Sequence, residues 1–156
     1  HAFTPTVSNI RPTSRGYVSI VDKDSRTYAK IKQNYLSTEH DRMIAAKSLR
    51  LTRKIIMESE TFKKYLPEEY RPGIHLNDDE ELVKEASNYA QTIFHPVGTC
   101  KMGQDENAVV DEKLRVKGLK NLRVIDASIM PNITSGNTNA PTIMIAEKGA
   151  DMIINN

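Results

Sequence analysis

The first candidate for a catalytic side chain is the histidine of "FHPVGTCKMG", residues 94–103. Pro96 restricts the backbone directly after His95, and Gly98 and Gly103 permit tight turns in the same loop. A rigid loop that presents one imidazole suits a general base, because imidazole exchanges protons near neutral pH. The alternative is a surface histidine that makes only a structural hydrogen bond.

A second stretch, "SGNTNAPT" at residues 135–142, carries two asparagines beside a glycine. Pro141 suits the first turn of a helix, and the backbone before it contains Gly136, Asn137 and Asn139. Amide donors at a helix N-terminus favour a negatively charged ligand group. Ordinary turn chemistry before a helix is the competing explanation, although one asparagine would be enough for a cap.

The other possible catalytic or metal-binding residues have weaker support from the sequence. Cys100 is the single cysteine and has no second nucleophile motif beside it, so a small packed residue is the better interpretation. The carboxylates of "HLNDDEE", residues 75–81, begin a helix and are read as partners of its dipole rather than as metal ligands. His1, His40 and His75 show no metal-ligand spacing, so no metal is expected. No Gly-x-Gly-x-x-Gly dinucleotide fingerprint occurs in the chain.

Composition limits the class of protein. The 156 residues carry 22 basic and 20 acidic side chains, dispersed along the chain, so no nucleic-acid partner is expected. No apolar run approaches the roughly 20 residues of a membrane span, and no secretory signal is visible. A single cysteine cannot form an internal disulfide, which fits a reducing compartment.

Two short strands and two helices are expected before the histidine loop. Alternation over residues 17–22 and again over 27–31, around the turn "DKDS", predicts an antiparallel hairpin. Residues 37–59 form a helical pattern with Ser37 or Thr38 as N-cap, and residues 77–94 form another with Asn77 or Asp78 as N-cap. Pro96 ends the second helix, which is expected to reach Phe94.

After the histidine loop, the pattern changes to short β-like pieces and one helix. Leu114–Val116 and Leu122–Ile125 are expected to be strand-like on either side of a turn at Gly118. The last helix is expected to begin near Ala140 and, being mostly apolar, to be well buried. The fold class expected is therefore α+β, with an antiparallel sheet and packed helices.

The two loops and their flanks resemble the C-terminal part of the glucose–methanol–choline (GMC) oxidoreductases. The resemblance lies in "HPVGTCKMG" followed by "AVVDEKLRVKGLKNLRVIDASIMPNITSGNTNAPTIMIAEKGADMI", and extends less specifically to "RPTSRGYV". In appearance the chain is closest to FAD-dependent alcohol and choline dehydrogenases. The resemblance implies a substrate domain with a sheet and helices, plus a C-terminal strand and helix that normally complete the FAD domain.

The resemblance also implies roles for individual residues. It makes His95 and Asn137 the catalytic pair of one active site, with the substrate hydroxyl between them. His95 would accept the hydroxyl proton while a hydride moves to the flavin, giving an aldehyde or ketone. Residues expected to lie along FAD or near its ring are Asp126, Ala127, Thr138 and Asn139.

Domain organisation and partners follow from the same resemblance. Residues 1–93 correspond to the substrate-domain sheet and helices, and residues 94–156 to the active-site loops and final helix. The partners implied are an alcohol substrate and an N-terminal FAD-binding portion of the same protein. That portion's main motif is absent from this chain, so we expect the chain alone neither to bind FAD tightly nor to turn over alcohol. Exposed Ile143 and Met144 would then favour dimers or local rearrangement of the two loops.

Several questions stay open at this point. The sequence does not choose between choline and another alcohol, between oxidase and dehydrogenase, or among electron acceptors. A cytoplasmic location, or a peripheral one at the inner membrane of a bacterium, is expected. A non-catalytic module derived from the family is the alternative function, and an unrelated structural α+β domain is the third.

Overall fold

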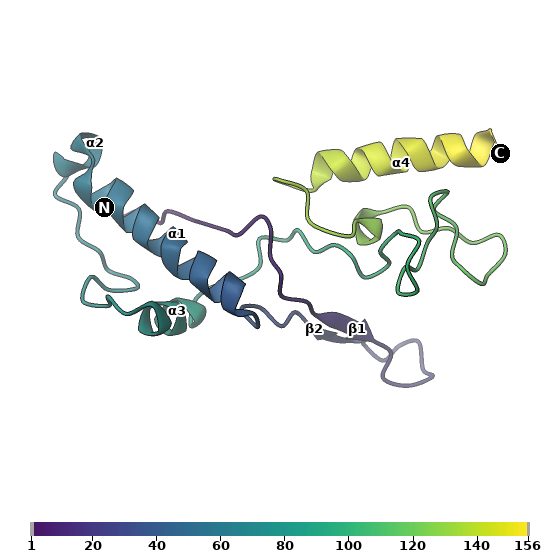
Figure 1. Cartoon of the computed structure of the whole chain (residues 1–156), viewed down its shortest axis with the longest axis horizontal. Coiled ribbons are helices and arrows are strands. Elements are labelled where there is room, and N and C mark those ends of the chain that lie inside the picture. The colour runs from purple at the N-terminus through teal and green to yellow at the C-terminus, as the bar shows by residue number, and fades with distance from the viewer. Residues whose placement is uncertain (1, 156) are drawn as a thin grey trace. The chain divides into compact units, whose positions relative to one another are not determined.

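The computed structural model describes residues 2–155 and divides into two compact units. One unit comprises the chain up to Gly16 together with Gln33–Gln91, and the other comprises Tyr17–Lys32 and the chain from Thr92 onward. The described elements, labelled in Figure 1, are β1 (Tyr17–Ser19), β2 (Lys30–Lys32), α1 (Glu39–Glu58), α2 (Glu60–Lys63), α3 (Asp79–Ser87), the 3₁₀ helix η1 (Ala127–Ile129) and α4 (Asn139–Ile154).

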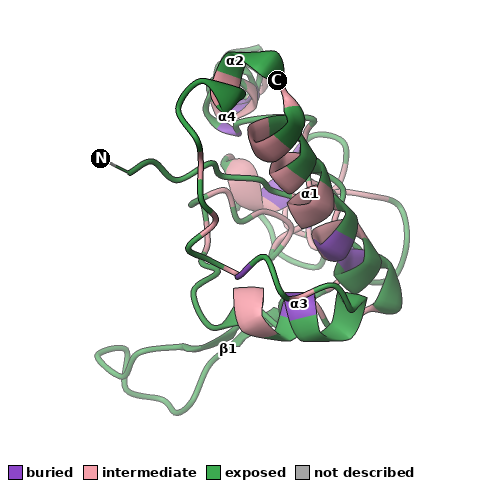
Figure 2. Cartoon of the chain, turned by 90° about the vertical axis from the view of Figure 1, so that its left-hand side faces the viewer, coloured by how far each residue is buried: buried purple, intermediate pink, exposed green. Residues whose placement is uncertain are grey.

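The first unit is built on α1 and α3. The side chain of Thr38 accepts a hydrogen bond from the backbone of Asp41, and Asp78 caps α3 in the same way through Glu80 and Glu81, so both expected helix starts are confirmed. The buried apolar residues of these helices are Ala46, Leu82 and Val83. In Figure 2 the buried stretches of α1 and α3 are short and lie between exposed ones.

An ion pair ties α1 to the loop that precedes α3. Arg53 Nε donates to Glu69 Oε2 at 2.6 Å, and its side chain is 15% exposed against 11% for Glu69. Arg53 also donates to the backbone carbonyls of Leu76 and Gly73, while Gly73 N–H donates to Glu69. Burial would raise the pKa of Glu69, but the hydrogen bond and charge of Arg53 outweigh it and lower that pKa.

The expected hairpin is present and short. β1 and β2 pair antiparallel with Val18 opposite Ile31, and all six strand residues are exposed. The α+β class is therefore confirmed, with a sheet that has two strands in the described part of the chain. The hairpin groups with the second compact unit, whereas the helices α1 to α3, which follow it in sequence, belong to the first.

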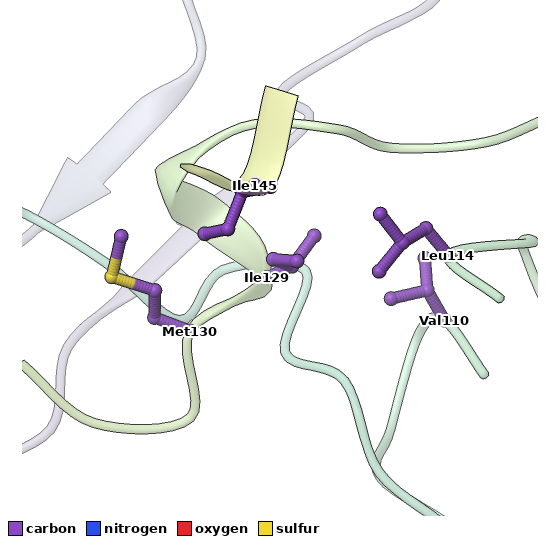
Figure 3. Packing of buried hydrophobic residues seen from close by; sticks show 5 residues of the cluster. All are labelled: Val110, Leu114, Ile129, Met130 and Ile145. Atoms are coloured by element: carbon purple, nitrogen blue, oxygen red, sulfur yellow. The ribbon is translucent and has the colours of Figure 1, made fainter. Parts of the chain in front are cut away.

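The second unit has the larger core. The residues of its hydrophobic cluster come from the loops after the histidine, from the η1 segment and from α4, and are Val110, Leu114, Ile129, Met130 and Ile145 (Figure 3). Ile145 of α4 packs in the same cluster as Ile129 and Met130, so this cluster holds α4 against η1 (Figure 3). At Gly149 the helix comes so close to Ile125 that an added Cβ would lie within 2.9 Å of its Cδ1.

Four expectations about elements were wrong. The second helix ends at Ser87 rather than Phe94, because Asn88 N–H bonds back to Glu85 and Ala86 and closes the helix there. The pieces at 114–116 and 122–125 form isolated bridges, such as Arg115 with Arg123, rather than strands. α4 is mostly exposed, with only Ile145 and Gly149 buried. The "VIDAS" segment, residues 124–128, was expected to supply the C-terminal strand implied by the resemblance, but it contains the cap Asp126 and the start of the 3₁₀ helix η1.

No helix in the described residues is both long and apolar enough to cross a membrane.

Candidate active site

The histidine loop is held by its backbone. Phe94 adopts a positive φ of 63°, which is uncommon for a residue with a side chain and turns the chain sharply before His95. Gly98 has a φ of 89°, and a Cβ there would lie 3.3 Å from the carbonyl oxygen of Met130. The loop therefore needs glycine at this position to approach the segment after η1.

Two backbone hydrogen bonds attach the same loop to η1. Cys100 N–H donates to the carbonyl of Ser128 at 3.0 Å, and Met102 N–H donates to that of Ile129 at 2.8 Å. Cys100 itself is a partly buried free thiol. Because Ile129 belongs to the core, the loop that carries His95 is anchored to the best-packed part of its unit.

The second loop ends at Thr138, directly before α4. The carbonyl of Thr138 accepts from the N–H of Thr142 at 3.0 Å and from its hydroxyl at 2.7 Å, which fixes the first turn of the helix. Thr138 is only 7% exposed, whereas Asn137 and Asn139 on either side are exposed. The loop thus offers one buried hydroxyl between two accessible amides.

The two loops meet at the imidazole of His95. Asn137 Nδ2 lies 2.9 Å from His95 Nε2, and Thr138 Oγ1 lies 2.9 Å from His95 Nδ1. Both ring nitrogens are therefore engaged by residues 42 and 43 positions away in sequence. His95 is partly buried, while the side chain of Asn137 reaches solvent, so the open side of this pair is the Asn137 side.

The direct contact leaves no room for a hydroxyl oxygen on the line between the two nitrogens. A hydroxyl could reach Nε2 only if the exposed Asn137 side chain moved aside. The inserted hydroxyl can then donate to Nε2 and accept from Asn137 Nδ2, using the same acceptor and the same donor as before. The pair is therefore chemically matched to one hydroxyl group.

The other expected site residues are placed around this centre. Asn139 is the first residue of α4 and is exposed. Asp126 is exposed and its carboxylate accepts from Ser128 N–H at 2.7 Å, which caps η1. Ala127 is partly buried against the core. Of the four residues expected near a flavin, only Thr138 has a side-chain hydrogen bond to His95 among the described contacts.

The start of α4 has features that fit an electron-rich ligand edge. Its first turn contains no acidic residue, and no side chain caps its N–H groups. These donors and the positive end of the helix dipole are open to a carbonyl or anionic group. The hydroxyl of Thr134, in the loop that leads to Asn137, is buried and has no hydrogen-bond partner within residues 2–155. The segment thus offers polar groups that suit the polar edge of a ligand such as the flavin expected from the sequence.

Sequence reasoning missed the contact between Thr138 and His95. The signal available was the position of Thr138 between two asparagines at a helix start, which reads as ordinary capping. Residues 2–155 contain no group of three or more His, Cys, Asp or Glu side chains placed to hold a metal ion, and His1 lies outside the described residues.

Comparison with known proteins places this geometry in a family. A sequence model of the GMC oxidoreductases matches residues 12–146, which include both loops. Oxygen-dependent choline dehydrogenase of Pseudomonas savastanoi pv. phaseolicola is 50% identical over 153 residues, covering 98% of this chain and 27% of that protein. The enzyme of the same name from Escherichia coli is 48% identical over the same lengths.

Solved structures agree with the sequence matches. Pyridoxine 4-oxidase from Mesorbium loti superposes with a TM-score of 0.87 at 37% identity, covering 94% of this chain and 28% of that one. Formate oxidase of Aspergillus oryzae, from a structural study of the modification of its FAD, superposes with a TM-score of 0.87 at 30% identity. The match covers 99% of this chain and 29% of that one. The chain spans about a quarter of the length of the curated relatives it matches. It belongs to the GMC oxidoreductase family.

Proposed function

We propose that this chain is the part of an FAD-dependent alcohol dehydrogenase that binds and deprotonates the substrate hydroxyl, and that the alcohol is choline. The observation that carries the proposal is the 2.9 Å contact between His95 Nε2 and Asn137 Nδ2, two side chains brought together from separate loops. Choline is favoured because relatives named choline dehydrogenase match nearly the whole chain at about 50% identity.

In this proposal His95 is the general base. The alcohol enters between Nε2 and the Asn137 amide, and its proton passes to Nε2 as the carbon–hydrogen bond weakens. Asn137 donates to the same oxygen and stabilises the negative charge that develops there. Positioned proton transfer of this kind contributes roughly 10²–10⁴-fold to a rate.

FAD, when bound, supplies the acceptor for the two electrons removed from the carbinol carbon. The residues that would hold it are Asn139 with the uncapped first turn of α4, and the Asp126–Ala127 segment. The first turn of α4 would offer its uncapped N–H donors to the flavin and would favour electron density on the adjoining ring edge.

A substrate panel tests the proposal on the complete protein that contains this chain, purified with its flavin. Choline, 3,3-dimethylbutan-1-ol, pyridoxine and benzyl alcohol are compared by oxygen consumption and aldehyde formation. Dimethylbutanol has the shape of choline without its charge, so it separates recognition of the cation from recognition of the hydroxyl. We expect choline to give the highest kcat/KM. A flavoprotein that oxidises none of these alcohols would contradict the proposal.

A further inference from the structure

Thr138 occupies a helix N-cap position without capping the helix. A capping hydroxyl normally accepts from the second or third N–H of its helix, which stabilises the helix by roughly 1 kcal/mol. Here the backbone of Thr138 is already helical, with φ −88° and ψ −3°, and no side-chain cap bond forms. Its hydroxyl lies 2.9 Å from His95 Nδ1 instead. Thr138 is 7% exposed, so its hydroxyl is largely shielded from water and needs a hydrogen-bond partner within the protein, which His95 provides.

The two contacts of His95 together determine which nitrogen carries the proton. An amide nitrogen can only donate, so Asn137 Nδ2 facing Nε2 at 2.9 Å requires Nε2 to accept. A neutral imidazole with a free lone pair at Nε2 carries its hydrogen at Nδ1. Nδ1 therefore donates to Thr138 Oγ1, and the threonine acts as an acceptor.

We propose that Thr138 is a positioning residue that holds His95 in the Nδ1–H tautomer with Nε2 ready to take a proton. The inference rests on the proposed function, in which Nε2 is the base that receives the substrate proton. When Nε2 becomes protonated, the same Thr138 oxygen continues to accept from Nδ1, so the ring stays in place through the proton transfer. The first turn of α4 fixes the backbone that carries this hydroxyl, since the N–H and the hydroxyl of Thr142 both donate to the Thr138 carbonyl.

The alternative tautomer, with the hydrogen at Nε2, cannot accept the substrate proton at Nε2. With the hydrogen at Nε2, that N–H would oppose the Asn137 amide donor, and the lone pair would lie at Nδ1, away from the substrate. Removing the Thr138 hydroxyl takes away the only described acceptor at Nδ1. The valine variant should therefore shift the ring population towards Nε2–H and lower the fraction competent for catalysis.

The tautomer can be measured directly. In the complete protein labelled with ¹⁵N at histidine, the ring-nitrogen shifts of His95 report which nitrogen bears hydrogen, and the His95→Gln spectrum identifies its signals. Above the pH at which the ring becomes neutral, we expect the Nδ1–H tautomer in the wild type and in Thr138→Ser. Thr138→Val should lose this preference. Thr52→Val is the control, because it removes a helix hydroxyl that likewise donates to a backbone carbonyl, that of Ser48 in α1.

Kinetics provides the second readout. We expect Thr138→Val to lower kcat by roughly 10–100-fold, as loss of an orienting partner does, with little change in KM or flavin content. Thr138→Ser should restore the rate, and Thr52→Val should leave it close to wild type. Rescue by serine distinguishes a hydroxyl that orients the ring from a side chain that only fills space.

The outcomes separate this inference from the proposed function. An Nε2–H tautomer in the wild type would overturn the inference even if choline is oxidised, because Thr138 would then be a donor. Equal kinetics for Thr138→Val and wild type would also overturn it. If no alcohol is oxidised but the wild type shows the Thr138-dependent Nδ1–H tautomer, the structural assignment stands and the proposed function fails.

Discussion

At the scale of single residues, Asp41 shows how hydrogen bonds keep a buried carboxylate charged. Its oxygens accept from the backbone of Thr13 at 2.9 Å and of Ser14 at 2.8 Å, and also from the side chains of Thr13 and Asn9. The residue is 4% exposed. Burial would raise its pKa, but these hydrogen bonds outweigh burial and lower the pKa from 3.8 to about 2. Asp41 thereby fastens the segment 9–14 to the start of α1.

Acid titration should reveal that contribution. The pKa of Asp41 is lower in the folded state than its ordinary value of 3.8, so its stabilisation is complete above that pH and is lost as pH falls through about 2. The difference corresponds to about 2 kcal/mol of unfolding free energy. Urea unfolding of the chain at pH 7 and below pH 3 measures it.

Asp41→Asn is the variant for this test. It should be less stable than wild type at pH 7 and should lose less stability on acidification. Asp22→Asn is the control, because Asp22 is exposed and accepts only a local turn bond from Asp24. Identical acid sensitivity in Asp41→Asn and wild type would show that another carboxylate governs the transition.

At the scale of elements, the position of α4 depends on contacts at Ile145 and Gly149. Ile145 belongs to the core cluster, and Gly149 lies directly against Ile125. The C-terminal part of the helix is also contacted by Arg123, which donates to the carbonyl of Met152. Because α4 carries Thr138 at its start, these contacts set where the hydroxyl meets His95.

Gly149→Ala tests this packing. Alanine is favoured over glycine within a helix by about 1 kcal/mol, yet here its Cβ would press on Ile125 Cγ2 and lie 2.9 Å from Cδ1. We expect a net destabilisation of roughly 1–3 kcal/mol, as for other overpacked sites, measured by urea unfolding. In an Ile125→Ala background the same change should cost little. Equal costs in both backgrounds would show that the two residues are not coupled.

The starts of α1 and α3 were predictable because the sequence signal of a helix cap is local. Thr38 and Asp78 could be identified as caps because a cap bond spans only two or three residues. The end of α3 could not, because Tyr89 and Ile93 continue the helical spacing although the hydrogen bonds of Asn88 close the helix. The exposure of α4 was not predicted either. Its apolar composition suggested a buried helix, but composition does not specify what packs against a helix.

At the scale of the whole molecule, the candidate site was only partly predictable. Loop composition singled out His95 and the two asparagines Asn137 and Asn139, the family resemblance selected Asn137, and the structure brings the side chains of His95 and Asn137 into contact. The partnership of Thr138 with His95 was not predicted, because it joins residues 43 positions apart, although Pro141 lacks the N–H that a capping hydroxyl would use at the third residue of α4. Asn137 remains exposed, so the described chain alone does not enclose a substrate. The chain matches 27% of the length of its choline dehydrogenase relatives, and the remaining site walls are proposed to lie outside the matched part.

The most direct test of the central claim is the rate at which choline reduces the flavin of the complete protein without oxygen, in wild type and in His95→Gln. We predict that the variant retains its flavin but is reduced roughly 10²–10⁴-fold more slowly, the usual contribution of a positioned acid or base. His40→Gln, which changes an exposed histidine of α1, should be reduced at the wild-type rate. Equal reduction rates for His95→Gln and wild type would contradict the assignment of His95 as the base.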